Sequence, residues 1–71
     1  MTDWTLFDDM QCAEVDGLTI YAREDGSWVI WRTKGENTTR INSAGEAKDY
    51  GIDMESAKSL ALAYAHKHLT R

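Results

Sequence analysis

The sequence contains no proline and only one cysteine among its 71 residues. The single cysteine, Cys12, excludes an internal disulfide, and no cysteine–histidine spacing suggests structural zinc. A chain of this length forms one small domain, residues 1–71, whose stability must come from packing when no disulfide or metal assists it. A lone thiol also fits a reducing compartment.

Long apolar segments are missing as well. The longest near-apolar window, LALAYA at residues 60–65, is far shorter than the roughly 20 residues that a membrane-spanning helix needs. The N-terminal segment MTDWTLFDDMQ has neither the basic start nor the apolar run of a signal peptide. We therefore expect a soluble cytoplasmic protein with no membrane partner.

Basic residues are absent from the first 22 positions, which carry five carboxylates: Asp3, Asp8, Asp9, Glu14 and Asp16. From Arg23 onward, eight basic residues stand against seven acidic ones. Nucleic-acid binders gain affinity from a basic surface, so the acidic segment disfavours nucleic acid and is compatible with a basic protein partner. The alternative is that these carboxylates only keep a small domain soluble.

Turn signals divide the first part of the chain into short strands. Asp-Gly pairs at 16–17 and 25–26 favour hairpin turns, and LTIYAR (18–23) and SWVIWRT (27–33) are rich in β-branched and aromatic residues. A third turn at residues 34–37 leads to a weaker strand, TTRIN (38–42). The segment MQCAEV before Gly17 is either a further strand or an irregular lead-in. The sequence thus predicts a strand meander over about 10–42.

The C-terminal part has helical signals. Ser43 and Glu46 have capping-box spacing, which predicts a short helical turn at about 44–50, and Gly51 suits a left-handed helix end. Asp53 is a good N-cap for a main helix at about 54–69. Its apolar arc comprises Met54, Ala57, Leu60, Ala61, Tyr64, Ala65 and Leu69. The prediction is an α+β fold, a three- or four-stranded antiparallel β-meander with one C-terminal α-helix packed across one face.

Trp28 and Trp31 are three residues apart on one strand, so they point to opposite faces. A two-residue turn at Asp25-Gly26 places Trp31 under the helix, whereas a three-residue loop exchanges the faces and brings the position of Arg32 into the core. The first register buries no charge, so we favour it. Its second face carries Thr19, Tyr21, Arg23, Trp28, Ile30 and Arg32.

One helix cannot cover both faces of the sheet, so one tryptophan remains to be explained. The N-terminal residues Trp4, Leu6 and Phe7 could fold back and close the second face. Otherwise a second copy of the chain or a foreign partner would cover it, since Trp, Tyr and Arg are enriched in interaction hot spots. An aromatic face with arginines also resembles a stacking platform for single-stranded nucleic acid.

Catalytic and metal-binding patterns are weak. Cys12 has no histidine near it in sequence and fits a half-buried strand position. His66 and His68 point to opposite sides of a helix and cannot ligate one metal together. Asp8-Asp9 lacks the alternating pattern of a calcium loop, and no glycine-rich phosphate loop occurs. We therefore expect no enzyme, no cofactor and no metal site.

The hairpin segment DGSWVIW followed by DMESAKSLALAYAHKHL resembles small orphan proteins of bacteriophages and prophages, such as anti-CRISPR-type host-takeover inhibitors. This resemblance covers most of the chain. It implies a protein that acts in the host-cell cytoplasm by binding and blocking a host complex rather than by chemistry. It assigns no functional residue.

These observations together predict a non-enzymatic protein-binding module that binds and inhibits a host protein or nucleic-acid-processing complex. A homodimer and a single-stranded nucleic-acid binder using Arg23, Arg32 and Arg40 are the alternatives. The predicted partner-binding residues are Tyr21, Arg23, Trp28, Ile30, Arg32, Asp8, Asp9 and Glu14.

Overall fold

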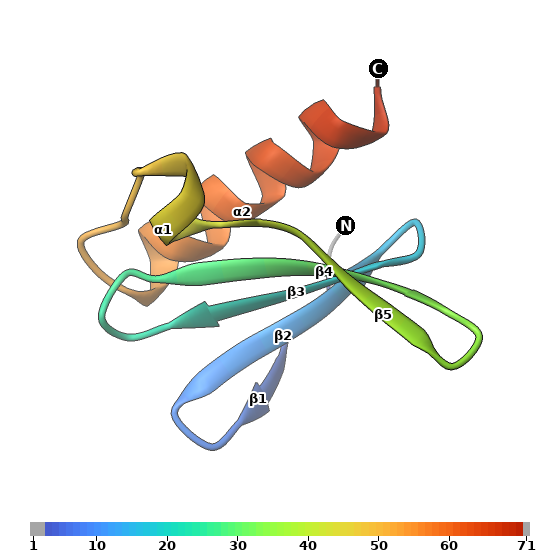
Figure 1. Ribbon diagram of the computed structural model, residues 1–71. Helices are drawn as coiled ribbons and strands as arrows, with labels where there is room; N and C mark the ends of the chain where they lie inside the picture. Colours follow the sequence, from blue (N-terminus) through green and yellow to red (C-terminus); the bar gives the residue numbers. More distant parts are fainter. Residues whose placement is uncertain (1–2, 71) are drawn as a thin grey trace.

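Five strands form one antiparallel sheet in the computed structural model, which describes residues 3–70. They are β1 (Thr5–Phe7), β2 (Met10–Val15), β3 (Leu18–Arg23), β4 (Trp28–Lys34) and β5 (Asn37–Ser43). Each strand pairs with its neighbour in sequence, giving the order β1-β2-β3-β4-β5 (Figure 1). The fold is α+β, but the sheet has five strands instead of the predicted three or four.

The additional strand comes from the N-terminal segment. Phe7 pairs with Met10, which leaves Asp8 and Asp9 as a two-residue turn, with Asp8 at a φ of 58° that aspartate tolerates better than most residues. Leu6 and Phe7 are 69% and 59% exposed. The idea that this segment folds over the second face of the sheet is therefore wrong, because it extends the sheet at its edge instead.

Two helices follow the sheet, α1 (Ala44–Ala47) and α2 (Met54–Leu69), and α2 lies across one face of the sheet (Figure 1). Asp53 caps α2, because its carboxylate accepts the backbone N–H of Ser56 at 2.9 Å. Ser43 caps α1 in the same way through the N–H of Glu46 at 3.2 Å. These caps fix where both helices begin.

The predicted end of the first helical turn is wrong. The left-handed residue that ends α1 is Lys48, with a φ of 55°, and its backbone N–H bonds to the carbonyl of Ala44. Gly51 serves a different purpose, because its N–H donates to the carbonyl of Gly26 at 2.8 Å. The segment between the helices is thereby fixed to the β3–β4 loop.

The core lies between α2 and the two central strands. Ala57, Ala61 and Ala65 are fully buried, and their small side chains let α2 lie close on β3 and β4. Among the described residues, the strands contribute these buried side chains to the cluster: Leu18, Ile20, Ala22, Trp28 and Ile30.

The favoured register of the β3–β4 hairpin is also wrong, and the three-residue alternative is present. The N–H of Arg23 donates to the carbonyl of Ser27 at 2.9 Å, which encloses a loop of residues 24–26. Ala22 therefore pairs with Trp28, and Trp28 faces the helix with only 2% of its surface exposed. Trp31 is the tryptophan that points to the other face.

Arg32 occupies the helix side of β4 without being buried. It pairs with Leu18 near the end of the hairpin, is exposed, and its Nη2 lies 2.9 Å from Nε2 of His68. The core face of β4 is not dry along its whole length. Arg32 lies far enough along the strand to reach water, so the register buries no charge after all.

Candidate functional site

The sheet face opposite α2, here called the open face, carries a group of aromatic and apolar side chains. Strand alternation and the antiparallel register place them there, since Met10 pairs with Arg23, Tyr21 with Val29, and Trp31 with Arg40. Among residues 3–70, no helix covers this face (Figure 1). An uncovered face of this composition is the leading candidate for a functional surface.

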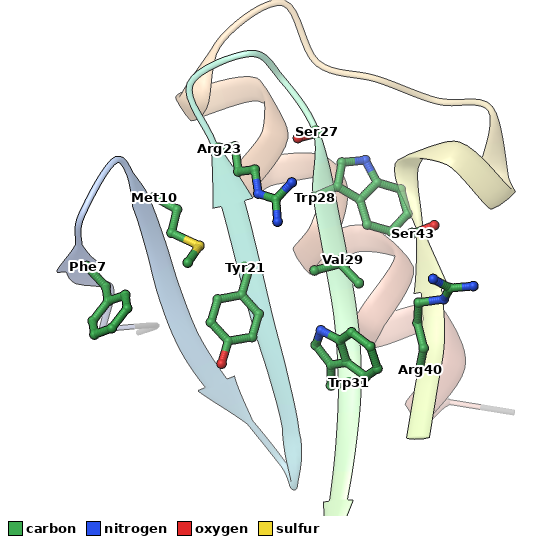
Figure 2. Close-up of a pocket in the computed structure, with 10 residues that line it drawn as sticks. All are labelled: Phe7, Met10, Tyr21, Arg23, Ser27, Trp28, Val29, Trp31, Arg40 and Ser43. Carbon is green, nitrogen blue, oxygen red and sulfur yellow. The ribbon is translucent and has the colours of Figure 1, made fainter. Parts of the chain in front are cut away.

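A hollow of about 530 Å³ lies at the centre of the open face. Figure 2 shows Tyr21, Val29 and Trp31 along its middle, with Phe7 and Met10 on the β1–β2 side. Tyr21, Val29 and Trp31 are half-buried, whereas Phe7 is 59% exposed. The hollow thus offers an apolar surface that neighbouring side chains only partly shield from water.

Two arginines border this hollow. Arg23 reaches from β3 toward β4, and Arg40 stands on β5 beyond Trp31 (Figure 2). Arg40 forms an ion pair with Glu46 of α1, which holds its guanidinium at the edge of the face. An aromatic centre with flanking guanidinium groups suits contact with a protein side chain or a stacked base.

Carboxylates border the same face on the β1–β2 side. Asp3, Glu14 and Asp16 line a second hollow of about 690 Å³, which shares Tyr21 with the first. Glu14 is exposed and pairs across the strands with Thr19. The open face is therefore acidic along β2 and basic toward β5, with the aromatic residues between.

The structure brings some of the predicted binding residues together and separates others. Tyr21 and Arg23 lie on the open face beside the first hollow. Trp28 is 2% exposed and Ile30 fully buried, so neither is available as a surface anchor. Arg32 lies on the helix side of the sheet. Placing these last three on the open face was wrong, because it rested on the wrong register.

The acidic residues of the prediction are all exposed. Asp8 and Asp9 form the β1–β2 turn, next to Phe7 and Met10 of the first hollow, and Glu14 lies on β2. Sequence reasoning missed Phe7 and Met10 as members of this surface, and it placed Val29 and Trp31 there only in the register that was not favoured. The turn signal in Asp8-Asp9 could have indicated the first hairpin, and with it the exposure of Phe7.

The residue types that bind metals do not cluster in the described part of the chain. No group of three or more His, Cys, Asp or Glu side chains within residues 3–70 could hold a metal ion. Cys12 is free and half-buried on β2. His66 is exposed, while His68 contacts Arg32.

Comparisons with models of known protein families, with curated protein sequences and with solved structures give no match for this chain. Within the described residues, the helices are too short or too polar to cross a membrane.

Proposed function

We propose that this chain is a non-enzymatic protein-binding module that binds a host-cell protein and thereby inhibits it. The role is the one implied by its resemblance to small phage and prophage proteins. The observation that supports the proposal best is the hollow of the open face, where Tyr21 and Trp31 are half-buried between Arg23 and Arg40. The other side of these strands is buried under α2, so the open face is the side on which Tyr21 and Trp31 can meet a partner.

The residue types at the hollow are those that dominate protein interfaces. Trp, Tyr and Arg are enriched among hot-spot residues, which lie at the centre of a contact and are shielded from water by neighbours. Trp31 fits this description, since Val29, Tyr21 and Arg40 surround it. Removal of its ring should cost about 2 kcal/mol or more of binding free energy.

The charge of the surroundings indicates the chemistry of the partner. Asp3, Glu14 and Asp16 line the neighbouring hollow, and Asp8 and Asp9 stand at the turn beside Phe7. A partner that presents an apolar side chain to the first hollow and basic side chains to these carboxylates is complementary to both. Charge complementarity of this kind accelerates association and excludes wrong partners.

A single-stranded nucleic-acid binder is the second candidate. Trp31 and Tyr21 between Arg23 and Arg40 offer stacking surfaces with cations beside them. The acidic residues along β2 oppose it, because they would repel a phosphate backbone, and Arg32 is not on this face. Affinity for such a ligand would fall steeply with salt.

The test is a pull-down from a bacterial host lysate with four proteins: wild type, Trp31→Ala, Tyr21→Ala and His66→Ala. His66 is an exposed ring on α2, so His66→Ala controls for the loss of a surface ring elsewhere. We expect one discrete host protein to be retained by wild type and by His66→Ala and lost by Trp31→Ala. With that protein purified, Asp8→Asn and Glu14→Gln should slow association more than they speed dissociation.

Three results would contradict the proposal. Retention of the same protein by folded Trp31→Ala would show that the open face is not the contact. Binding of an oligo-dT strand that weakens steeply with salt and needs Trp31 would establish the nucleic-acid alternative. A mass that doubles with concentration for wild type, but not for Trp31→Ala, would show that a second copy covers the face.

A further inference from the structure

A third hollow, of about 380 Å³, lies on the helix side of the sheet at the β5 edge. α2 packs on β3 and β4, and the last turns of α2 run beside β5 without covering this strand. The hollow is the space that remains between them. A β-bulge opposite Ile30 and Trp31 bends β5 at this point. We call this hollow the β5–α2 groove, and its lining is Arg40, Ile41, Asn42, Tyr64, Lys67 and His68.

The helical wall of this groove is held in place by other contacts. The hydroxyl of Tyr64 donates to Oδ2 of Asp49 at 2.9 Å, and its ring stacks on Trp28. His68 is held by the contact between its Nε2 and Nη2 of Arg32 at 2.9 Å. A ligand would thus meet a wall that is already ordered, which lowers the entropy lost on binding.

The charge of the β5–α2 groove is opposite to that of the whole chain. The net charge is −4, yet the lining contains no carboxylate. Lys67 is exposed there and the guanidinium of Arg32 adjoins the groove through His68, whereas Arg40 is ion-paired with Glu46. Lys67 and His68 belong to the last turn of α2, where cations also stabilise the carbonyl end of the helix. A ligand with carboxylates is the complementary chemistry.

The strand beside the groove has a free edge. β5 is the last strand in the order of the sheet, and residues 37–40 are exposed. The unpaired N–H and C=O groups of an edge strand can pair with an extended segment of another chain. A nucleic acid would use the cations but not this backbone edge, so the combination favours a peptide.

We propose that the β5–α2 groove binds an extended acidic peptide segment, which adds to β5 as a sixth strand. Its carboxylate side chains would face Lys67 and the guanidinium of Arg32 beside His68, and its backbone would pair with residues 37–40. This site shares Arg40 with the hollow at Trp31, but Lys67 and His68 line the groove and not that hollow, so Lys67→Glu tests this proposal separately from the function proposed above.

The experiment uses fluorescein-labelled heptapeptides of alternating threonine and glutamate, and measures their binding to the full chain by anisotropy. A peptide with lysine in place of glutamate tests charge. Two versions of the acidic peptide, N-methylated at alternate residues, test backbone pairing, because an added strand turns every second N–H toward β5.

We expect the acidic peptide to bind and the lysine peptide not to bind. Lys67→Glu should weaken binding roughly tenfold or more, since it replaces a charge-assisted contact by repulsion. Arg23→Glu makes the same change in net charge on the opposite face, and it should alter binding by less than about threefold if long-range charge is minor. One of the two N-methylated peptides should lose its binding, and hydrogen exchange should show protection of residues 37–40 when the unmodified peptide is bound.

Other outcomes would overturn the proposal. If both N-methylated peptides bound equally well, the peptide would be held by charge alone and not by pairing with β5. If Arg23→Glu weakened peptide binding as much as Lys67→Glu does, the effect of Lys67 would be one of overall charge and not of a contact in the groove. Absence of binding at millimolar peptide would exclude the site. Binding of oligo-dT in place of the peptide, with the same dependence on Lys67, would assign the groove to phosphate. Protection of residues 37–40 without peptide, together with a doubled mass, would assign the edge to a second copy.

Discussion

The ring of Trp28 stacks on the ring of Tyr64, with centroids 4.8 Å apart and an angle of 23° between their planes. The indole N–H of Trp28 also donates to the carbonyl of Asp49 at 2.8 Å. One side chain of β4 is thereby joined to α2 and to the segment between the helices. This contact decides which of the two tryptophans is structural.

Substitution of the two tryptophans should therefore have very different effects on stability. Trp28→Ala removes a buried ring, its stack and a hydrogen bond, and should lower the free energy of unfolding by about 3–5 kcal/mol. Trp31→Ala removes a half-buried ring from the open face and should cost less than about 1.5 kcal/mol. Urea unfolding followed by circular dichroism measures both values. Equal losses would mean that Trp31 also belongs to the core.

The register of β3 and β4 shows where reasoning from sequence stops. Both registers could be derived from the Asp25-Gly26 turn, but the choice between them depends on contacts with distant residues. Trp28 faces α2, where its ring stacks on Tyr64 and its indole N–H donates to the carbonyl of Asp49. The three-residue loop is held by the hydrogen bond from Gly51 to Gly26. None of these contacts has a local signal in the strand.

Gly26 should be the glycine least tolerant of substitution in the hairpin turns. Its φ is +90°, and a Cβ atom there would overlap the carbonyl oxygen of Gly51. Gly26→Ala combines left-handed strain of about 1–2 kcal/mol with overpacking of about 1–3 kcal/mol. The free energy of unfolding should therefore fall by roughly 2–5 kcal/mol in thermal or urea denaturation.

The matched control is Gly35→Ala in the β4–β5 turn. Gly35 has a φ of +64°, but nothing lies within 4 Å of a Cβ built there. Only the strain remains, about 1–2 kcal/mol. If the two variants lose the same stability, the contact between Gly26 and Gly51 does not constrain the loop.

Local features were predictable and long-range ones were not. The cap at Asp53 and the alanine stripe of α2 follow from spacing within a few residues, and the structure has both. β1 was missed because a strand of three residues has almost no periodicity. Of the open face, Tyr21 and Arg23 were predicted from β3 alone, whereas Trp31 required the register.

The cap of α2 should make stability depend on pH in the acid range. The backbone N–H of Ser56 donates to the carboxylate of Asp53, and this bond, with the Ser56 hydroxyl, lowers the pKa of Asp53. Because the folded pKa lies below the unfolded value, the carboxylate contributes stability that is present above the unfolded pKa. That contribution is lost as the pH falls through the folded pKa.

Asp53→Asn keeps an oxygen acceptor for the cap but cannot titrate. Wild type should be the more stable protein near neutral pH, and the difference should shrink as the pH falls below about 4. Unfolding free energies measured from neutral pH to about pH 2.5 give this difference directly. Asp9→Asn is the control, because it removes one carboxylate from an exposed turn. If both variants had the same pH profile, the cap at Asp53 would not be the source of the pH dependence.

Tyr64 should show the opposite dependence, in the alkaline range. Its hydrogen bond to Asp49 raises the pKa of the Tyr64 phenol, and burial and the negative charge of Asp49 act in the same direction. Because the folded pKa lies above the unfolded value, this bond contributes stability that is fully present below the unfolded pKa of about 10. The contribution is lost as the pH rises through the folded pKa.

Ultraviolet titration of phenolate formation tests this relationship. The chain has three tyrosines, and Tyr64→Phe should remove a component that ionises above the usual tyrosine range. Asp49→Asn should keep Tyr64 but lower its pKa toward the ordinary value, since the charge and the charged acceptor are both lost. Tyr50→Phe is the control, because Tyr50 is 60% exposed. If Tyr50→Phe removed the high component instead, the bond between Tyr64 and Asp49 would not be present in solution, and one wall of the β5–α2 groove would lack its support.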